Sequence, residues 1–151
     1  MILQQPLFSP ESSWSVPDVF PQFSETETIA IDLETYDPHL MTCGPGWATG
    51  RGHVVGIGVA TKGWQGYFPI RHQGGGNLDE ALVLRWLTKM LSSTKRDVIF
   101  HNSLYDVGWL RREGVDVKGR ILDTIVAAPL VNENRYSYSL DNLGEFYCDE
   151  K

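Results

Sequence analysis

The sequence predicts an α/β fold in which helices flank a five-stranded mixed sheet. Three observations lead to this expectation: an early run in which apolar and polar residues alternate, a hairpin pattern after it, and then strand and helix patterns that take turns. Three strands followed by helix, strand, helix, strand and helix predict an antiparallel meander that continues through right-handed parallel crossovers.

The first three strands are expected in the N-terminal half of the chain. Residues 28–35 place an apolar side chain at every second position, as a strand with one buried face does. After a glycine-rich surface excursion, the strand-like runs 53–61 and 63–70 meet near Lys62, which predicts a hairpin. These runs form the expected meander.

Helical spacing begins after the hairpin. Asn77 and Glu80 have the spacing of a capping box, and the apolar residues after them recur at helical intervals, so we expect a helix of about four turns. The short apolar run 97–101 predicts the fourth strand, and Ser103 is expected to begin a helix that ends at Gly114. A parallel crossover therefore joins the meander to the fourth strand.

The two ends of the chain complete the expected organisation. Residues 121–127 predict a fifth short strand that runs into a helix, and 139–147 predict a last helix with its apolar residues on one side. Residues 1–27 are rich in Pro, Ser and Gln with isolated aromatic residues, so we expect an irregular arm packed on the domain. We expect this arm to be followed by one domain at 28–151.

Composition limits the classes of protein. A chain of 151 residues with 42% hydrophobic residues is the size of one domain with one core. No run approaches the roughly 18 apolar residues of a membrane span, so we expect a soluble cytoplasmic protein without a membrane partner. The net charge of −6 argues against binding nucleic acid by phosphate neutralisation alone. Residues 38–78 contain no acid, and we expect their cations Arg51, Lys62 and Arg71 to meet phosphates.

Asp32 and Glu34 are the first candidates for chemistry. They are two residues apart on the first strand, so both carboxylates face the same side, with Cα atoms roughly 6.5 Å apart. One metal ion could contact both, and hard Mg²⁺ or Mn²⁺ suits oxygen ligands. The alternative is a polar strand face without chemistry. Carboxylates at the end of an apolar strand are costly without a metal or a cation, which favours the metal site.

A third carboxylate, Asp106, lies in the run HNSLYD after the fourth strand. Its alternative role is structural, because Ser103 and Asp106 have capping spacing and an acid in a first helical turn is stabilised by the helix dipole. Asn102 and Tyr105 offer hydrogen-bonding groups at the same strand end, which is the edge where open α/β sheets bind ligands. We expect His101 to be a packed or capping residue.

Several motifs together resemble a known family. The run IAIDLET resembles the first exonuclease motif of the DEDD (DnaQ-like) superfamily, and HNSLYD resembles its second. The runs GPGW, YFPIRH, LDT and YSLDNLGEFY extend the resemblance over nearly the whole chain. The sequence is therefore similar to the 3′-5′ proofreading exonuclease domain of a family A DNA polymerase of phage type, and the order of its elements is that of the ribonuclease-H-like fold.

The resemblance implies removal of 3′-terminal nucleotides from DNA by hydrolysis with two Mg²⁺ or Mn²⁺ ions. The implied catalytic residues and metal ligands are Asp32, Glu34 and Asp106. The implied substrate-binding residues, near a single-stranded DNA 3′ end, are Thr35, Asn102 and Tyr105. Asp123 recurs in the family as well, and we expect it to have a structural role at the start of the helix beginning at Thr124.

The family's third motif, a Tyr or His before a fourth catalytic Asp, has no match here. None of the six tyrosines is followed four residues later by an acid, and only His101 has the alternative spacing, to Asp106. We therefore expect the domain to be completed beyond Lys151, with a polymerase domain in the same or a split chain as partner. The rival interpretations are an inactive nuclease-like domain that binds single-stranded DNA or a polymerase, and a purely structural α/β domain.

Overall fold

The computed structural model describes residues 15–148 of the chain. The aromatic residues Phe8 and Trp14 of the expected arm lie outside the described residues. Among residues 15–148, no helix has the length and apolar character that crossing a membrane requires.

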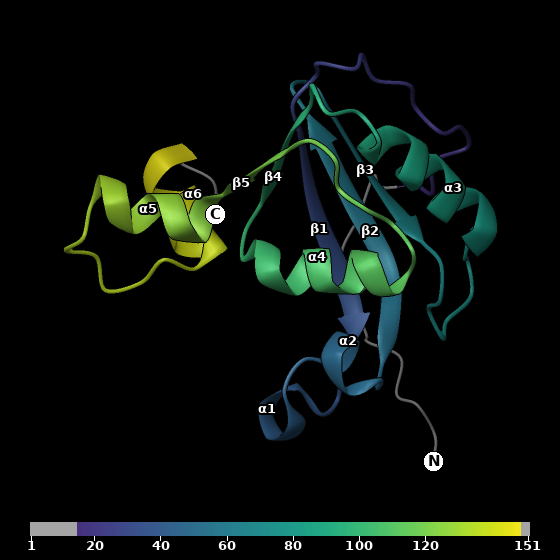
Figure 1. Ribbon diagram of the computed structural model, residues 1–151, viewed down its shortest axis with the longest axis horizontal. Coiled ribbons are helices and arrows are strands. Elements are labelled where there is room, and N and C mark those ends of the chain that lie inside the picture. The colour runs from purple at the N-terminus through teal and green to yellow at the C-terminus, as the bar shows by residue number, and fades with distance from the viewer. Residues whose placement is uncertain (1–14, 149–151) are drawn as a thin grey trace, which may run out of the picture.

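A five-stranded mixed sheet forms the centre of the fold, with the strand order β3-β2-β1-β4-β5 (Figure 1). The strands are β1 (Ile29–Tyr36), β2 (His53–Thr61), β3 (Trp64–Pro69), β4 (Asp97–Phe100) and β5 (Arg120–Asp123). The first three form an antiparallel meander, and β4 and β5 run parallel to β1. The predicted α/β class and the mixed topology are therefore confirmed.

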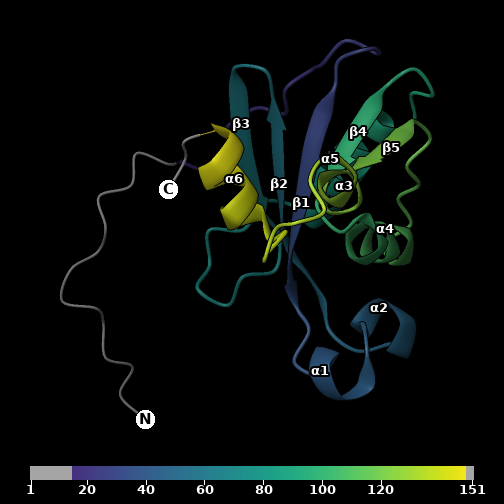
Figure 2. The same ribbon diagram turned by 90° about the vertical axis from the view of Figure 1, so that its left-hand side faces the viewer.

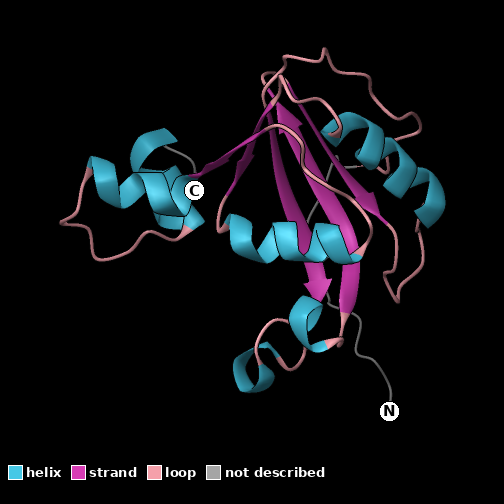
Figure 3. Cartoon of the chain, in the orientation of Figure 1, coloured by secondary structure: helices cyan, strands magenta, loops and turns pink. Residues whose placement is uncertain are grey.

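Six helices are found in the described part of the chain. They are α1 (Leu40–Cys43), α2 (Gly46–Thr49), α3 (Glu80–Leu91), α4 (Ser103–Arg112), α5 (Thr124–Val131) and α6 (Leu140–Cys148). Helix α3 lies on one side of the sheet and α5 and α6 on the other (Figures 1 and 2). Helices α1 and α2 lie beyond the end of β1, so the glycine-rich excursion contains two short helices that its pattern does not indicate (Figure 3).

The core forms between β1 and α3. Ile29, Ile31 and Leu33 are buried on one face of β1 and belong to the same cluster as Val83 and Leu87 of α3. Because side chains alternate along a strand, the polar residues between them face the opposite side. The alternation read from the sequence thus fixes which face of the sheet carries the carboxylates.

The described part of the arm, residues 15–27, contains no helix or strand, and Pro21 O accepts a hydrogen bond from Trp86 of α3, so the arm packs on the α3 side of the sheet. The ring of Phe20 stacks on Phe68 of β3, with centroids 5.9 Å apart. Arg96 is 3% exposed and donates hydrogen bonds to the carbonyls of Ser24 and Glu27. A buried guanidinium therefore ties the arm to the residue before β4.

The start of α3 differs from the prediction. The helix is capped by Asp79, whose side chain accepts a hydrogen bond of 2.9 Å from Leu82 N. Asn77 instead exchanges two hydrogen bonds with the backbone of His72, so its side chain is not free to cap a helix. The predicted capping box of Asn77 and Glu80 is wrong because Asn77 closes the preceding glycine-rich turn.

Arg71 joins the end of β3 to two helices. Its guanidinium donates to the carboxylates of Glu80 in α3 and Glu113 after α4, and to the carbonyl of Val54. The hydrogen bonds with Glu113 and Glu80 raise the pKa of Arg71 above its usual range. Arg71 is committed to the fold, and the expectation that it meets phosphates is wrong.

The Arg71 network provides a test of the fold. Arg71→Gln should lower the free energy of unfolding by about 3 kcal/mol, because Glu113, only 14% exposed, loses its cation. Arg120→Gln breaks the pair with Asp97 at the surface and should leave the urea midpoint unchanged. Equal midpoints for the wild type and Arg71→Gln would contradict this role.

Candidate active site

Asp32 and Glu34 are exposed on the face of β1 that turns away from the core. Their direct partners on β2 are Gly58 and Gly56, and the next pair along the strand joins Ala30 to an alanine. Because these partners carry at most a methyl group, no large side chain of β2 lies beside the two carboxylates. The side chains of β2 therefore leave room on this face beside the two carboxylates.

A cavity of about 400 Å³ lies on the same face, next to Asp32. Gly58 and Tyr67 line it on the β2–β3 side, and His101 and Leu140 line it on the side of β4 and α6. The carboxylate of Asp32 thus borders a hollow that strands and a helix enclose together.

Asp106 lies in the first turn of α4 and is 4% exposed. Its Oδ1 accepts a hydrogen bond of 3.1 Å from the backbone N–H of Leu33, the residue between Asp32 and Glu34. Strand β4 pairs with β1 only at residues 29–30, so β1 extends past its neighbour and α4 lies beside the extension (Figure 1). Since its carboxylate binds β1, the alternative that Asp106 serves only its own helix is wrong.

The electrostatic environment of Asp106 is unusual for a carboxylate. Burial raises its pKa, the hydrogen bond from Leu33 lowers it, and the charge of Asp32 raises it again, which brings the pKa to about 7. Among the described residues, no Lys, Arg or His forms an ion pair with Asp106. A buried carboxylate beside another carboxylate is a site where a bound cation would favour ionisation.

The donor chemistry of these residues fits a hard divalent cation, since all three candidate ligands are carboxylates. The geometry fits in part: Asp32 and Glu34 share one face, and Asp106 reaches the backbone between them. Within residues 15–148, no three His, Cys, Asp or Glu side chains are gathered closely enough to hold a metal ion.

Thr35 and Tyr105 meet at the end of β1. The strand register shifts between Glu34 and Thr35, and the Thr35 hydroxyl donates to Tyr105 Oη at 2.8 Å while Tyr105 donates to Asp37 Oδ2 at 3.0 Å. Burial raises the pKa of Tyr105. The two predicted substrate-binding residues are therefore neighbours, which their distance of 70 positions along the chain does not reveal.

The GPGW run supports this hydroxyl network, a role that the sequence did not indicate. The backbone N–H of Gly46 donates to Asp37 Oδ2 at 2.8 Å, on the same oxygen that Tyr105 reaches. Trp47 packs against Gly108 of α4, where an added Cβ would lie 2.4 Å from the indole. The motif thus orients the Asp37 carboxylate and packs the glycine-rich segment between β1 and β2 against α4.

Asn102 and Asp123 shape the turn between β4 and α4. Asn102 has a left-handed backbone with φ of 74°, and its side chain does not cap the helix. Asp123 accepts hydrogen bonds from the backbone N–H groups of Asn102, Ser103 and Ile125. Burial by itself raises the pKa of Asp123, but these hydrogen bonds together lower the pKa below its usual value. The predicted structural role of Asp123 is confirmed, and it extends to both helices.

His101 has a packing role as well. Its Nδ1 lies 2.8 Å from the hydroxyl of Thr124, which in turn donates to the carbonyl of Phe100. The expectation of a packed histidine is confirmed.

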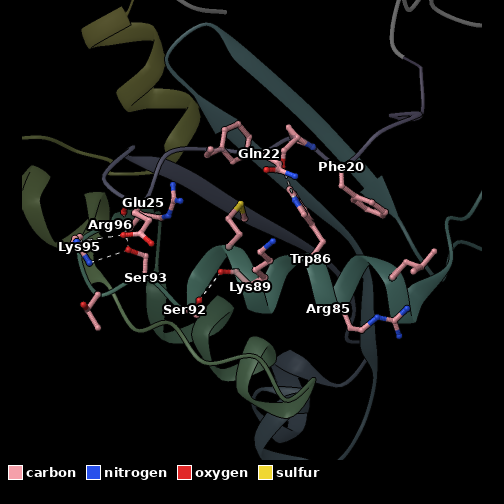
Figure 4. Close-up of a pocket in the computed structure, with 15 residues that line it drawn as sticks. Phe20, Gln22, Glu25, Arg85, Trp86, Lys89, Ser92, Ser93, Lys95 and Arg96 are labelled. Carbon is pink, nitrogen blue, oxygen red and sulfur yellow. Dashed lines mark hydrogen bonds and ion pairs between the residues drawn. The ribbon is translucent and has the colours of Figure 1, made fainter.

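A second cavity, of about 680 Å³, lies between α3 and the arm on the opposite face of the sheet. Basic residues gather on its rim, among them Arg85, Lys89 and Lys95, and its acid Glu25 pairs with Lys95 (Figure 4). None of the candidate carboxylates lines this cavity. The candidate active site is therefore the open face around β1 and α4.

Known proteins share both the sequence and the fold. The chain matches the 3′-5′ exonuclease family over residues 12–151. It is 38% identical to a DNA-directed DNA polymerase of Pseudomonas phage M6, over 95% of this chain and 23% of that protein. It is 29% identical to DNA polymerase DpoZ of Salmonella phage PMBT28, over 85% of this chain and 18% of that one. The chain thus spans about a fifth of the length of these relatives.

The structure of Brucella melitensis NrnC with bound Mg²⁺ resembles the fold, with a TM-score of 0.62 at 18% identity over 87% of this chain and 59% of that one. This similarity confirms the ribonuclease-H-like fold, and the match over residues 12–151 confirms the resemblance found in the motifs. The chain belongs to the 3′-5′ exonuclease family of the family A DNA polymerases.

Proposed function

We propose that this chain is the proofreading part of a DNA polymerase, which hydrolyses the 3′-terminal phosphodiester bond of a mispaired primer. The observation that carries the proposal is the position of Asp106: it accepts a hydrogen bond from the backbone N–H of Leu33, the residue that lies between Asp32 and Glu34 on β1. The cytoplasm of the host cell is the proposed place of action, since both relatives belong to phages.

Two divalent ions, Mg²⁺ or Mn²⁺, are the proposed cofactors, and Asp32, Glu34 and Asp106 are their proposed ligands. When bound, such ions supply activation of water and stabilisation of the leaving oxygen. Asp32 and Glu34 offer oxygens on the open face, while Asp106 is held in place by Leu33. The NrnC structure, which has the same fold, contains Mg²⁺, and this supports the proposal that the chain uses a divalent metal ion.

Thr35, Asn102 and Tyr105 are the proposed contacts of the DNA 3′ end. Thr35 follows Glu34 in β1, and its hydroxyl contacts the hydroxyl of Tyr105 in α4, which Asp37 orients. Asn102 precedes α4, and its exposed side chain is available because Asp123 takes over the capping of the helix. A single-stranded 3′ end is the proposed form of this substrate.

A further protein segment is the proposed source of a fourth carboxylate. Helices α5 and α6 lie on the carboxylate side of the sheet (Figure 2), and they expose large apolar side chains. They are Val126, Leu130, Val131, Leu140, Phe146 and Tyr147. Exposed apolar patches of this kind mark interaction surfaces. We infer that a polymerase domain, in the same or a second chain, covers these helices, as the greater length of the relatives suggests.

Metal binding is the first test. Asp32→Ala should weaken Mn²⁺ binding at least roughly tenfold in a calorimetric titration, because one of two same-face ligands is lost. Asp116→Asn is the matched control: Asp116 is exposed and pairs with Lys118, and its loss should leave Mn²⁺ affinity unchanged. Equal Mn²⁺ affinity in Asp32→Ala and the wild type would rule out this metal site.

Nucleotide release is the second test. With Mg²⁺ and a 3′-mismatched primer, the 151-residue chain should be at least about 10³-fold slower than the same chain joined to the segment that follows the matched region in a longer polymerase. Asp106→Ala should abolish release by the longer form. If the short chain is as fast as the longer one, then an acid of this chain completes the site, with Asp123 as the first candidate. A longer form that binds DNA without releasing nucleotides would instead favour the inactive nuclease-like domain.

A further inference from the structure

Tyr67 lies on β3, and strand β2 separates it from the candidate carboxylates Asp32 and Glu34 on β1. In β3 it pairs with Gly58, which is the β2 partner of Asp32. Its ring leans along the sheet and covers Gly56, because a Cβ added to Gly56 would stand 1.9 Å from the Tyr67 hydroxyl oxygen. Gly56 is therefore the residue that makes room for the ring, and any larger residue would push the hydroxyl away from its present position.

The position of the hydroxyl brings it beside Glu34. Gly56 and Glu34 are direct antiparallel partners, and the Cβ positions of such partners are about 4.5–5.5 Å apart. The Tyr67 hydroxyl stands close to where a Gly56 Cβ would be, so the Glu34 carboxylate can reach it from the neighbouring strand. Burial raises the pKa of Tyr67, and the charges of Glu34 and Asp32 raise it further, which agrees with this proximity.

His72 holds the hydroxyl in this place. Its Nε2 lies 2.6 Å from Tyr67 Oη, and the two rings meet edge to face with centroids 5.7 Å apart. The His72 backbone is fixed in turn by Asn77, whose side chain accepts from His72 N at 2.7 Å and donates to His72 O at 2.8 Å. The hydrogen bonds of Asn77 across the glycine-rich turn at 73–76 thus fix His72, and His72 in turn fixes the position of the Tyr67 hydroxyl.

We propose that Tyr67, oriented by His72, is a positioning residue that restrains the Glu34 carboxylate in the candidate metal site. The inference deepens the proposed function and rests on Glu34 being a metal ligand. An exposed glutamate samples several rotamers, and restraint before binding removes part of the entropy that a metal ion would otherwise have to overcome. Partners that orient ligating carboxylates typically change metal affinity by roughly 10- to 100-fold.

A double-mutant cycle with Mn²⁺ calorimetry tests the proposal. Tyr67→Phe keeps the ring over Gly56 and removes only the hydroxyl, and it should weaken Mn²⁺ binding roughly tenfold. In a Glu34→Gln background, the same substitution should change Mn²⁺ affinity no further, because the carboxylate that the hydroxyl restrains is gone. A role in packing alone would give equal effects in both backgrounds, and that outcome would overturn the proposal.

Variants of His72 give an independent readout. His72→Gln retains a side chain that can hydrogen-bond to the hydroxyl and should bind Mn²⁺ more tightly than His72→Ala, which should behave like Tyr67→Phe. Equal Mn²⁺ affinity in both His72 variants would contradict the orienting role. These experiments separate the two proposals. If the proposed function is wrong, Asp32→Ala binds Mn²⁺ as tightly as the wild type. If only this inference is wrong, Asp32→Ala still weakens Mn²⁺ binding, but Tyr67→Phe does not.

Discussion

The hydrogen bond from the Leu33 N–H to the Asp106 carboxylate is the contact on which the geometry of the site depends. Strand β1 extends past β4, which pairs with it only at residues 29–30, and a buried backbone N–H without an acceptor is costly. Asp106 supplies that acceptor from α4. The same bond anchors α4 to β1 and brings a third carboxylate to the backbone between Asp32 and Glu34. One contact therefore both completes the hydrogen bonding of β1 and assembles the candidate site.

This arrangement couples ionisation to stability. The pKa of Asp106 is raised to about 7 in the folded protein, so between pH 4 and 7 the folded state holds a proton that the unfolded state releases. The stability that this proton contributes is complete at low pH and is lost as the pH rises through about 7. A divalent cation at Asp32 and Asp106 would offset the repulsion between them. Repulsion between these carboxylates therefore lowers the stability of the fold, and a bound cation can restore that stability.

Local patterns determined some of these features and left others open. The alternation at 28–35 predicted that two carboxylates share one face of a strand, and the position of Asp123 predicted a role at the start of a helix. Both features could be predicted because each depends only on residues nearby in the sequence. The role of Asp106 depends on Leu33, 73 residues away, so the sequence was compatible both with a helix cap and with a site residue. The position of Tyr67 over a glycine depends on the β2–β3 register and on a rotamer, neither of which a single sequence specifies.

The most direct test of the Asp106 contact is the titration of its carboxyl carbon by NMR, in the metal-free protein and with Mg²⁺. The account predicts a midpoint near pH 7 without metal, because the group is buried beside Asp32, and a midpoint well below that with Mg²⁺. Asp116, at the surface and paired with Lys118, should titrate at low pH in both conditions. A midpoint near 4 for Asp106 in the metal-free protein, or one that Mg²⁺ does not move, would contradict the account.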